Sequence, residues 1–316
     1  MRILVSGATG VIGRRVVPLL LAQGHTVTAL TRHPAAHQQP AGVELARSDL
    51  FDPDALNRVV AGHDALINLA THMPSSSAKM LFRSAWRLND LIRSEGVANL
   101  VAAARNGGVT IFLQESFAPA YPDQGDRWID EQTPLAPARY NATLLDAERS
   151  VETFSADDRT GVILRFAAFY GPDAMQVHAY IDGLRKGWAL LPGGADRFIS
   201  SISHDDAATA VVAALKAPAG AYNVGDDEPV TRAVYFGSLA VGIGVGQPRF
   251  LPGWTAPLLG TVGPTMARSL RLSNRKLKDA TGWTPKFPGV REGWPATLAE
   301  MKDVQDAAAS VRKQRP

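Results

Sequence analysis

Three glycines near the amino terminus have the spacing of a phosphate-binding turn. Gly7, Gly10 and Gly13 follow the short apolar run of residues 2–6 and precede an apolar stretch typical of a helix. In such a unit the first glycine permits a tight turn, the second lets a pyrophosphate approach the backbone, and the third lets helix and strand pack closely. The start of the helix then offers N–H groups and a positive dipole end to the phosphates. The pattern predicts a dinucleotide site formed by Gly7, Thr9, Gly10, Val11, Ile12 and Gly13. The alternative is a structural turn in a protein that has lost this ligand.

The residues after the second expected strand indicate which dinucleotide binds. A fold that prefers NAD places Asp or Glu there to hold the ribose 2′-hydroxyl. Here the position is Thr31, and Arg32 follows it. A carboxylate would repel a 2′-phosphate, whereas an arginine binds it through paired hydrogen bonds. We therefore expect NADP, with NAD as the other candidate, and Arg32 as the 2′-phosphate ligand. The alternative is that Arg32 is a solvated loop residue.

The elements that position these residues alternate between strands and helices. Short apolar runs at 2–6, 25–30, 43–46, 65–69, 110–113 and 162–165 read as strands, and segments such as 54–61, 88–104 and 140–154 read as helices. This alternation predicts an α/β fold, a Rossmann doubly wound parallel sheet. Beyond about residue 170, Gly and Pro become frequent and the alternation breaks down. We therefore expect a dinucleotide-binding domain over residues 1–170 and a smaller substrate-binding region over 171–316, interleaved with the first.

Composition excludes several classes of protein. The 316-residue chain is 46% hydrophobic with a net charge of +3, and its Lys and Arg residues are scattered rather than clustered, which argues against a nucleic-acid partner. It contains no cysteine, so disulfides and thiolate metal sites are excluded, and no apolar run has the length of a membrane span. We expect a cytoplasmic protein with a small-molecule substrate and no membrane partner; a homodimer is left open.

Several motifs in order along the chain resemble the atypical and extended short-chain dehydrogenases/reductases, which include the NAD-dependent epimerase/dehydratase family. After the glycine turn come Ser48-Asp49-Leu50, Asn68-Leu69-Ala70-Thr71, Phe169-Tyr170-Gly171-Pro172, Ala221-Tyr222-Asn223-Val224 and Gly282-Trp283-x-Pro285 with Arg291-Glu292-Gly293-Trp294. The resemblance covers about residues 1–295. It implies that the Asp contacts the adenine and that the loop after the fourth strand lies beside the cofactor, which adds Asp49, Leu50, Leu69, Ala70 and Thr71 to the expected cofactor site.

The resemblance also implies a catalytic centre of Ser or Thr, Tyr and Lys, the last two in Tyr-x-x-x-Lys spacing. Residues four apart share a helix face. The Tyr exchanges a proton, the Lys lowers the pKa of the Tyr and holds the nicotinamide ribose, and the Ser polarises the substrate oxygen. Here Ser116 and Tyr140 fall at the Ser and Tyr positions, but position 144, where Lys is expected, holds Leu. The other interpretations are that Tyr140 is an ordinary buried tyrosine and Ser116 a simple loop hydroxyl.

One further run of polar residues resembles a ligand set. Ser203-His204-Asp205-Asp206 places ligand-type residues side by side. Adjacent residues rarely face a common centre, and an acidic first turn suits the start of a helix. We expect a helix start there and no metal.

Three functions remain open. The first is NADPH-dependent reduction of a carbonyl or imine on a small hydrophobic substrate, with a degenerate catalytic centre. The second is an epimerase, dehydratase or other lyase-type activity. The third is a cofactor-binding sensor or interaction protein without turnover, which the missing Lys favours and the retained Ser116 and Tyr140 disfavour.

Overall fold

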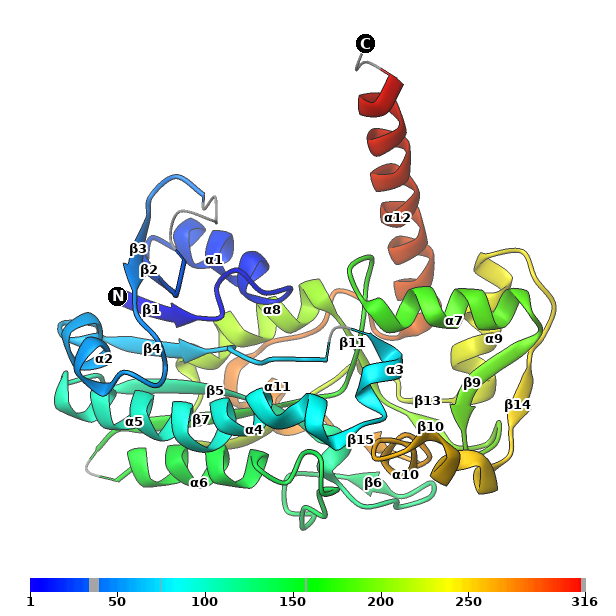
Figure 1. Cartoon of the computed structure of the whole chain (residues 1–316), viewed down its shortest axis with the longest axis horizontal. Helices are drawn as coiled ribbons and strands as arrows, with labels where there is room; N and C mark the ends of the chain where they lie inside the picture. Colours follow the sequence, from blue (N-terminus) through cyan, green and yellow to red (C-terminus); the bar gives the residue numbers. More distant parts are fainter. Residues whose placement is uncertain (34–39, 75, 157, 314–316) are drawn as a thin grey trace.

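A seven-stranded parallel sheet forms the centre of the molecule, seen in a computed structural model that describes residues 1–33, 40–74, 76–156 and 158–313 (Figure 1). All of its neighbouring strands pair in parallel. Across the sheet the strands are β12 (Gly220–Val224), β7 (Thr160–Phe166), β5 (Ile111–Phe117), β4 (Ala65–Asn68), β1 (Arg2–Ser6), β2 (Thr26–Thr31) and β3 (Val43–Arg47). The predicted doubly wound fold is confirmed.

Alternating apolar side chains give this sheet a core on each face. Successive strand residues point to opposite faces. In β1, Ile3 and Val5 pack into one core, which includes Val16 and Val211, whereas Leu4 packs into the other, which includes Leu100. Both faces are therefore covered by helices, as a purely parallel sheet requires.

The helices lie in two layers. The helices α1 (Gly13–Ala22) and α8 (His204–Ala213) pack together on one face, and α2 (Pro53–Val60), α5 (Val97–Asn106) and α6 (Leu144–Phe154) pack together on the other (Figure 1). The short α3 (Ser77–Met80), α4 (Arg87–Leu91) and a π-helical turn (Ile92–Gly96) precede α5. The predicted start of a helix at residue 204 is confirmed, because Ser203 caps α8 by accepting from the Asp206 N–H.

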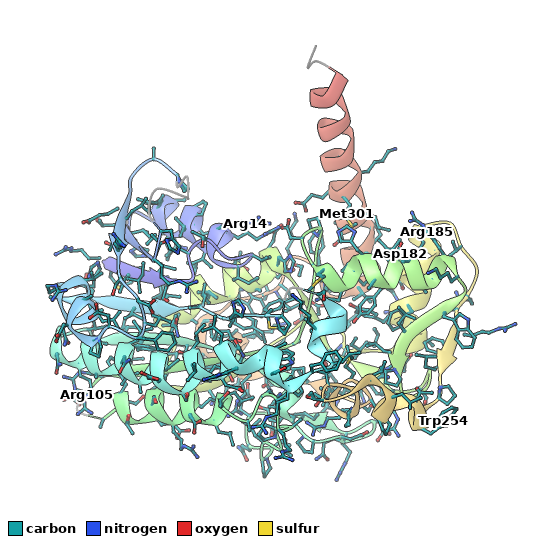
Figure 2. The ribbon with its side chains drawn as sticks, in the orientation of Figure 1. Arg14, Arg105, Asp182, Arg185, Trp254 and Met301 are labelled. Atoms are coloured by element: carbon teal, nitrogen blue, oxygen red, sulfur yellow. The ribbon has the colours of Figure 1, made fainter. Side chains whose placement is uncertain are left out.

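The second region packs beside the carboxyl ends of the strands. Its helices are α7 (Met175–Arg185), α9 (Arg232–Gly242), α10 (Gly263–Met266), α11 (Arg275–Thr281) and the long α12 (Val290–Lys313). Within it, β9 (Trp188–Pro192) pairs with β14 (Arg249–Leu251) and β10 (Phe198–Ile199) pairs with β13 (Val230–Thr231). Two of its strands pair with strands that precede residue 171: β11 (Ser201–Ser203) with β8 (Ala168–Tyr170), and β15 (Arg271–Leu272) with β6 (Trp128–Ile129). A separate apolar core including Trp294 and Phe236 holds α7, α9 and α12 together. On its outer surface Trp254 is 74% exposed (Figure 2).

Three sequence expectations differ from the structure. The strand series does not end at residue 165, because β12 returns from the second region to pair with β7. The expected helix over 88–104 is interrupted by the π-helical turn. The expected helix over 140–154 begins only at Leu144, after a series of tight turns. The division at residue 170 stays a prediction. Among the described residues, no helix combines the length and apolar character needed to cross a membrane.

Candidate active site

A cavity of about 700 Å³ lies at the carboxyl ends of the sheet strands, against the second region. Ligands of doubly wound sheets bind at this edge, outside the carboxyl ends of the strands. Every residue expected to bind the cofactor lines this cavity: Gly7, Thr9, Gly10, Val11, Ile12, Gly13, Arg32, Asp49, Leu50, Leu69, Ala70 and Thr71. Tyr140 also lines it, whereas Ser116 does not. The fold thus gathers one cofactor-sized wall from five separate loops.

The glycine turn fits a pyrophosphate. Gly7 has a φ of +78°, and a Cβ there would lie 2.6 Å from the Leu69 carbonyl carbon. A Cβ on Gly13 would lie 2.1 Å from the Gly7 oxygen, so larger residues would separate α1 from the turn. At Gly10 the nearest such atom is the Gly7 oxygen at 3.2 Å, a tight contact that a small shift of the turn would relieve. The amino end of α1 has neither a side-chain cap nor an acidic first turn. The Arg14 and Arg15 N–H groups donate to the Gly10 and Ile12 carbonyls, so this end attracts an anion through the positive end of the helix dipole.

The loop after β2 presents a cation and no carboxylate. Thr31 is buried and its hydroxyl accepts a hydrogen bond from the His33 N–H over 3.2 Å. Arg32 is exposed and lines the cavity.

Local hydrogen bonds fix the other two cofactor loops. Asp49 accepts from the Phe51 N–H over 3.1 Å, and the Leu50 carbonyl accepts from Asn99 over 2.9 Å. The Ala70 N–H donates to Asn68 Oδ1 over 3.2 Å. These contacts hold the backbone of both loops against the cavity.

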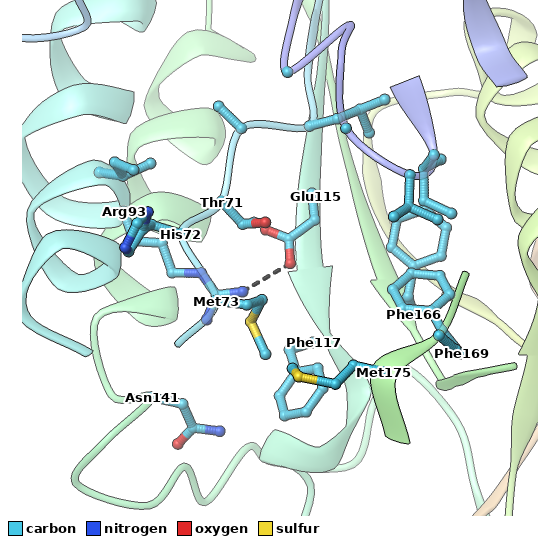
Figure 3. Close-up of a pocket in the computed structure, with 18 of the residues that line it drawn as sticks. Thr71, His72, Met73, Arg93, Glu115, Phe117, Asn141, Phe166, Phe169 and Met175 are labelled. Atoms are coloured by element: carbon cyan, nitrogen blue, oxygen red, sulfur yellow. Dashed lines mark hydrogen bonds and ion pairs between the residues drawn. The ribbon is translucent and has the colours of Figure 1, made fainter. Parts of the chain in front are cut away.

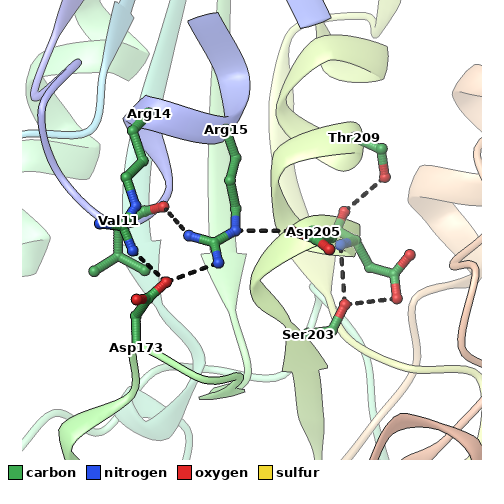
Figure 4. A network of polar contacts seen from close by, with 8 residues as sticks. Val11, Arg14, Arg15, Asp173, Ser203, Asp205 and Thr209 are labelled. Atoms are coloured by element: carbon green, nitrogen blue, oxygen red, sulfur yellow. Dashed lines mark hydrogen bonds and ion pairs between the residues drawn. The ribbon is translucent and has the colours of Figure 1, made fainter. Parts of the chain in front are cut away.

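An arginine joins the glycine turn to the second region. Arg15 donates to the Val11 carbonyl over 2.9 Å, to Asp173 over 2.8 Å and to Asp205 over 2.7 Å (Figure 4). Arg14 also pairs with Asp173. The phosphate-binding turn is thus tied to the loop after β8 and to the first turn of α8.

The structure does not bring Ser116 to the cavity. Its side chain is buried, and its hydroxyl donates to Glu148 Oε1 over 2.5 Å. Glu148 also accepts from Arg165 over 3.0 and 2.6 Å, and Arg165 donates to the Tyr121 hydroxyl over 2.8 Å. Strand alternation turns Ser116 toward Glu148 of α6, on the other side of β5 from Glu115, and the role of Ser116 toward the substrate stays a prediction.

Tyr140 lies in the cavity wall but not on a helix with position 144. It is 4% exposed, and its ring centroid is 4.7 Å from that of Trp86. Burial raises the pKa of Tyr140, and Thr265, Arg93 and Arg268 oppose that rise. Leu144 is buried outside the cavity, and neither Lys79 nor Lys186 lines it; among the described lining residues there is no lysine.

Several polar residues of the lining were not predicted, and Glu115, Arg93 and Asn141 are three of them. Glu115, next to Ser116 in β5, faces the cavity and accepts from Arg93 Nη2 over 2.7 Å (Figure 3). Asn141 follows Tyr140, is 1% exposed, and both of its side-chain polar atoms lack a partner among the described residues. The alternation of β5 was a signal for Glu115, but the resemblance directed attention to Ser116 instead.

Comparisons with known proteins agree with this geometry. The profile of the NAD dependent epimerase/dehydratase family matches residues 3–225. A 3-diazoavenalumate denitrifying reductase of a Streptomyces species is 35% identical over 308 residues, covering 93% of this chain and 99% of that protein. The chain belongs to the NAD-dependent epimerase/dehydratase family. The predicted family is thereby confirmed, and with it an NAD(P)-dependent enzyme of the short-chain dehydrogenase/reductase superfamily.

Two further proteins are similar to this chain, one in sequence and one in structure. A 2-alkyl-3-oxoalkanoate reductase of Shewanella oneidensis is 28% identical over 249 residues, covering 72% of this chain and 62% of that protein. The solved structure of a human epimerase family protein with NADPH superposes with a TM-score of 0.77 at 20% identity, covering 94% of this chain and 99% of that one. The structural likeness shows the family fold.

Proposed function

We propose that this family member is an NADPH-dependent reductase that acts on a carbonyl or imine of a small hydrophobic substrate. One observation carries the proposal: a single cavity holds the glycine turn and Arg32 at one end and an apolar chamber with Tyr140 at the other. When bound, NADPH supplies the hydride for such a reduction. Its 2′-phosphate is the reason for choosing it over NADH, because Thr31 stands where a carboxylate would bind the free 2′-hydroxyl and Arg32 follows it.

The chamber beyond the cofactor loops is lined mainly by apolar and aromatic side chains. They include Met73, Met80, Trp86, Phe117, Met175, Leu191, Phe198, Val262 and Met266. Such a lining binds apolar molecules by area and excludes water, and its methionines adapt to substrates of varied shape. The same lining also holds polar groups that could orient a substrate, including Tyr140, Asn141, Gln176, Ser200, Thr265 and Arg268.

Tyr140 is the proton donor in this proposal. Its buried hydroxyl has a raised pKa, so it is protonated at neutral pH. Hydride addition to a carbonyl leaves an alkoxide, and hydride addition to an imine leaves a deprotonated amine. Either product needs a proton, and a protonated tyrosine supplies it. Oxidation would require the deprotonated form, which burial disfavours. The site is therefore better suited to reduction than to oxidation.

Asn141 takes the orienting role that Ser116 does not take. Asn141 follows Tyr140 in the chain and lines the same cavity, with amide donor and acceptor both unpaired among the described residues. A substrate oxygen or nitrogen placed near the Tyr140 hydroxyl would satisfy the amide N–H. Asn141→Ala is expected to raise KM more than it lowers kcat, because the amide binds the ground state and the transition state alike.

The two similar reductases support this assignment, one named for a diazo compound and one for a 3-oxo acid. The test is NADPH consumption by the purified protein with a panel of hydrophobic ketones, aldehydes and imines. Consumption that depends on Tyr140 is the expected result. A protein that binds NADPH but consumes none with any member of the panel would favour a sensor, and isomerised or dehydrated product without net NADPH loss would favour the epimerase or lyase activity.

A further inference from the structure

Arg93 and Glu115 form an ion pair in the cavity wall, and one polar atom of each side chain has no hydrogen-bond partner within the described part of the chain. Arg93 Nη2 lies 2.7 Å from Glu115 Oε1, and the two side chains are 6% and 13% exposed. Within the described part of the chain, Arg93 Nε and Glu115 Oε2 have no hydrogen-bond partner. A buried polar atom without a partner costs free energy, so a ligand or ordered water is expected to satisfy it.

The strand order places this pair opposite Arg32 along the cavity. From the glycine turn after β1, Arg32 lies one strand away at the end of β2, and β4 and then β5 lie in the other direction. A dinucleotide whose pyrophosphate sits on the glycine turn extends both ways across these strand ends. The half that runs away from Arg32 must pass the Leu69–Thr71 loop and reach β5, where Glu115 faces Thr71 across the cavity wall (Figure 3).

The nicotinamide ribose needs a protein partner that the family's Lys does not provide here. Position 144 holds a leucine buried outside the cavity, and no lysine is among the described lining residues. A ribose presents two neighbouring hydroxyl donors, and an ionised carboxylate offers only acceptors. Asp or Glu binds the other ribose of a dinucleotide in NAD-preferring folds by this chemistry.

We propose that Glu115, held by Arg93, accepts hydrogen bonds from the hydroxyls of the nicotinamide ribose and replaces the missing Lys in cofactor binding. The inference rests on the proposed use of NADPH. Arg93 is the positioning residue, because its guanidinium holds Glu115 Oε1 at 2.7 Å and so orients the carboxylate. In this proposal the protein group at the ribose, Glu115, accepts hydrogen bonds, whereas the Lys of the family donates them.

The test compares two ligands that differ in the nicotinamide half. NADPH and adenosine 2′,5′-bisphosphate are titrated by calorimetry into the full-length wild type, Glu115→Ala and Glu115→Gln. Glu115→Ala is expected to weaken NADPH binding by about 10- to 100-fold, as for loss of a hydrogen bond to a charged group. Glu115→Gln, which keeps one acceptor, is expected to fall between wild type and Glu115→Ala. Binding of the bisphosphate, which lacks the nicotinamide ribose, is expected to change less than about twofold.

A matched control is Glu95→Ala, since Glu95 is an exposed carboxylate in the same π-helical turn as Arg93 and does not line the cavity. It should leave both ligands unaffected. Unchanged NADPH affinity in Glu115→Ala, or an equal loss for both ligands, would overturn the ribose contact while leaving the proposed function intact. A change confined to the KM of the organic substrate would assign Glu115 to that substrate and also overturn the proposal. A wild type that binds neither ligand would overturn the proposed function itself.

Discussion

Glu115 and Ser116 are neighbours in β5, and their side chains form ion-paired networks on opposite sides of the strand. Glu115 faces the cavity and pairs with Arg93 at 2.7 Å, whereas Ser116 donates to Glu148 at 2.5 Å in the network that includes Arg165. One network belongs to the ligand cavity and the other fastens α6 to the sheet. The same strand end therefore carries a binding group and a structural group in consecutive positions.

Ser116→Ala is predicted to lower stability and to spare catalysis. The change removes a buried donor to Glu148, for which we expect a loss of about 1–2 kcal/mol in the free energy of unfolding. Turnover per folded molecule should stay within about twofold of wild type, because Ser116 does not line the cavity. Urea unfolding and steady-state kinetics measure the two effects. Ser150→Ala, which removes a helix-local bond from α6, serves as control. A large loss of kcat at unchanged stability would restore the catalytic role.

Gly10→Val is predicted to abolish cofactor binding in a folded protein. The backbone at Gly10 has no positive φ, and its nearest obstacle, the Gly7 oxygen, is 3.2 Å from a new Cβ. The branched side chain would instead occupy the space needed by the pyrophosphate. Calorimetric titration with NADPH and circular dichroism test this. Gly246→Val is the control, because Gly246 is exposed with open space around it; this change should affect neither NADPH binding nor folding. Wild-type affinity in a folded Gly10→Val protein would place the phosphates elsewhere.

Arg32→Ala is predicted to remove most of the preference for NADPH over NADH. A charge-assisted contact with the 2′-phosphate contributes about 1–3 kcal/mol, or roughly 5- to 150-fold in Kd. The affinity for NADH should change little, because NADH has no phosphate at that position. Arg47→Ala, an exposed arginine at the end of β3 outside the cavity, is the control. Equal or tighter binding of NADH by the wild type would contradict the assignment of NADP.

The cofactor loops could be located because each follows a strand that an apolar run in the sequence predicts. Gly7 was predicted from the glycine spacing after a strand, whereas Asp49 and Leu69 were predicted from the family resemblance; all three line the cavity because the ends of parallel strands meet at one edge of the sheet. The face of β5 was not predictable in the same way, since a shift of one residue exchanges Glu115 for Ser116.

The start of α6 and the position of β12 depend on contacts that the local sequence pattern does not contain. Tyr140 precedes α6 because tight turns, such as the bond from the Asn141 N–H to the Ala138 carbonyl, hold its backbone. Strand β12 was not predicted because each of its residues pairs with a β7 residue 58 positions earlier, beyond any local pattern.

Stability is predicted to fall on acidification through His204. This histidine lines the cavity at the start of α8, and Gly171 approaches its unpartnered Nδ1. Burial, assisted by Arg15, lowers its pKa from 6.5 to about 4, against the opposing charges of Asp173 and Asp205. The folded state therefore binds fewer protons than the unfolded state between these values. The stability from neutral His204 is fully present above 6.5 and is lost as the pH falls toward about 4.

The expected loss across this window is on the order of 2–3 kcal/mol. His204→Gln should flatten the dependence of the free energy of unfolding on pH over the same range. His178→Gln, at an exposed histidine of α7, should leave the slope unchanged. Identical slopes for wild type and His204→Gln would contradict this account.

Tyr140→Phe is predicted to lower turnover while sparing NADPH affinity. The buried hydroxyl is the proton donor of the proposed reduction, and loss of a general acid costs about 10²- to 10⁴-fold in rate. Because burial raises the pKa of Tyr140, the wild type should keep its reductase activity to alkaline pH, and any oxidation in the reverse direction should rise steeply there.

The pH dependence of reduction and of oxidation is measured for the wild type and for Tyr140→Phe. Loss of both dependences in Tyr140→Phe would indicate proton donation, because a packing role against Trp86 would leave them unchanged. Tyr180→Phe is the matched control, since Tyr180 also lines the cavity but packs against Phe236 and Tyr235. It should lower kcat by less than about tenfold and leave both profiles unchanged. A reductase whose turnover and pH profiles survive in Tyr140→Phe would take its proton from another group on the cavity wall, and the Arg93–Glu115 pair and Asn141 would then be the side chains to substitute next.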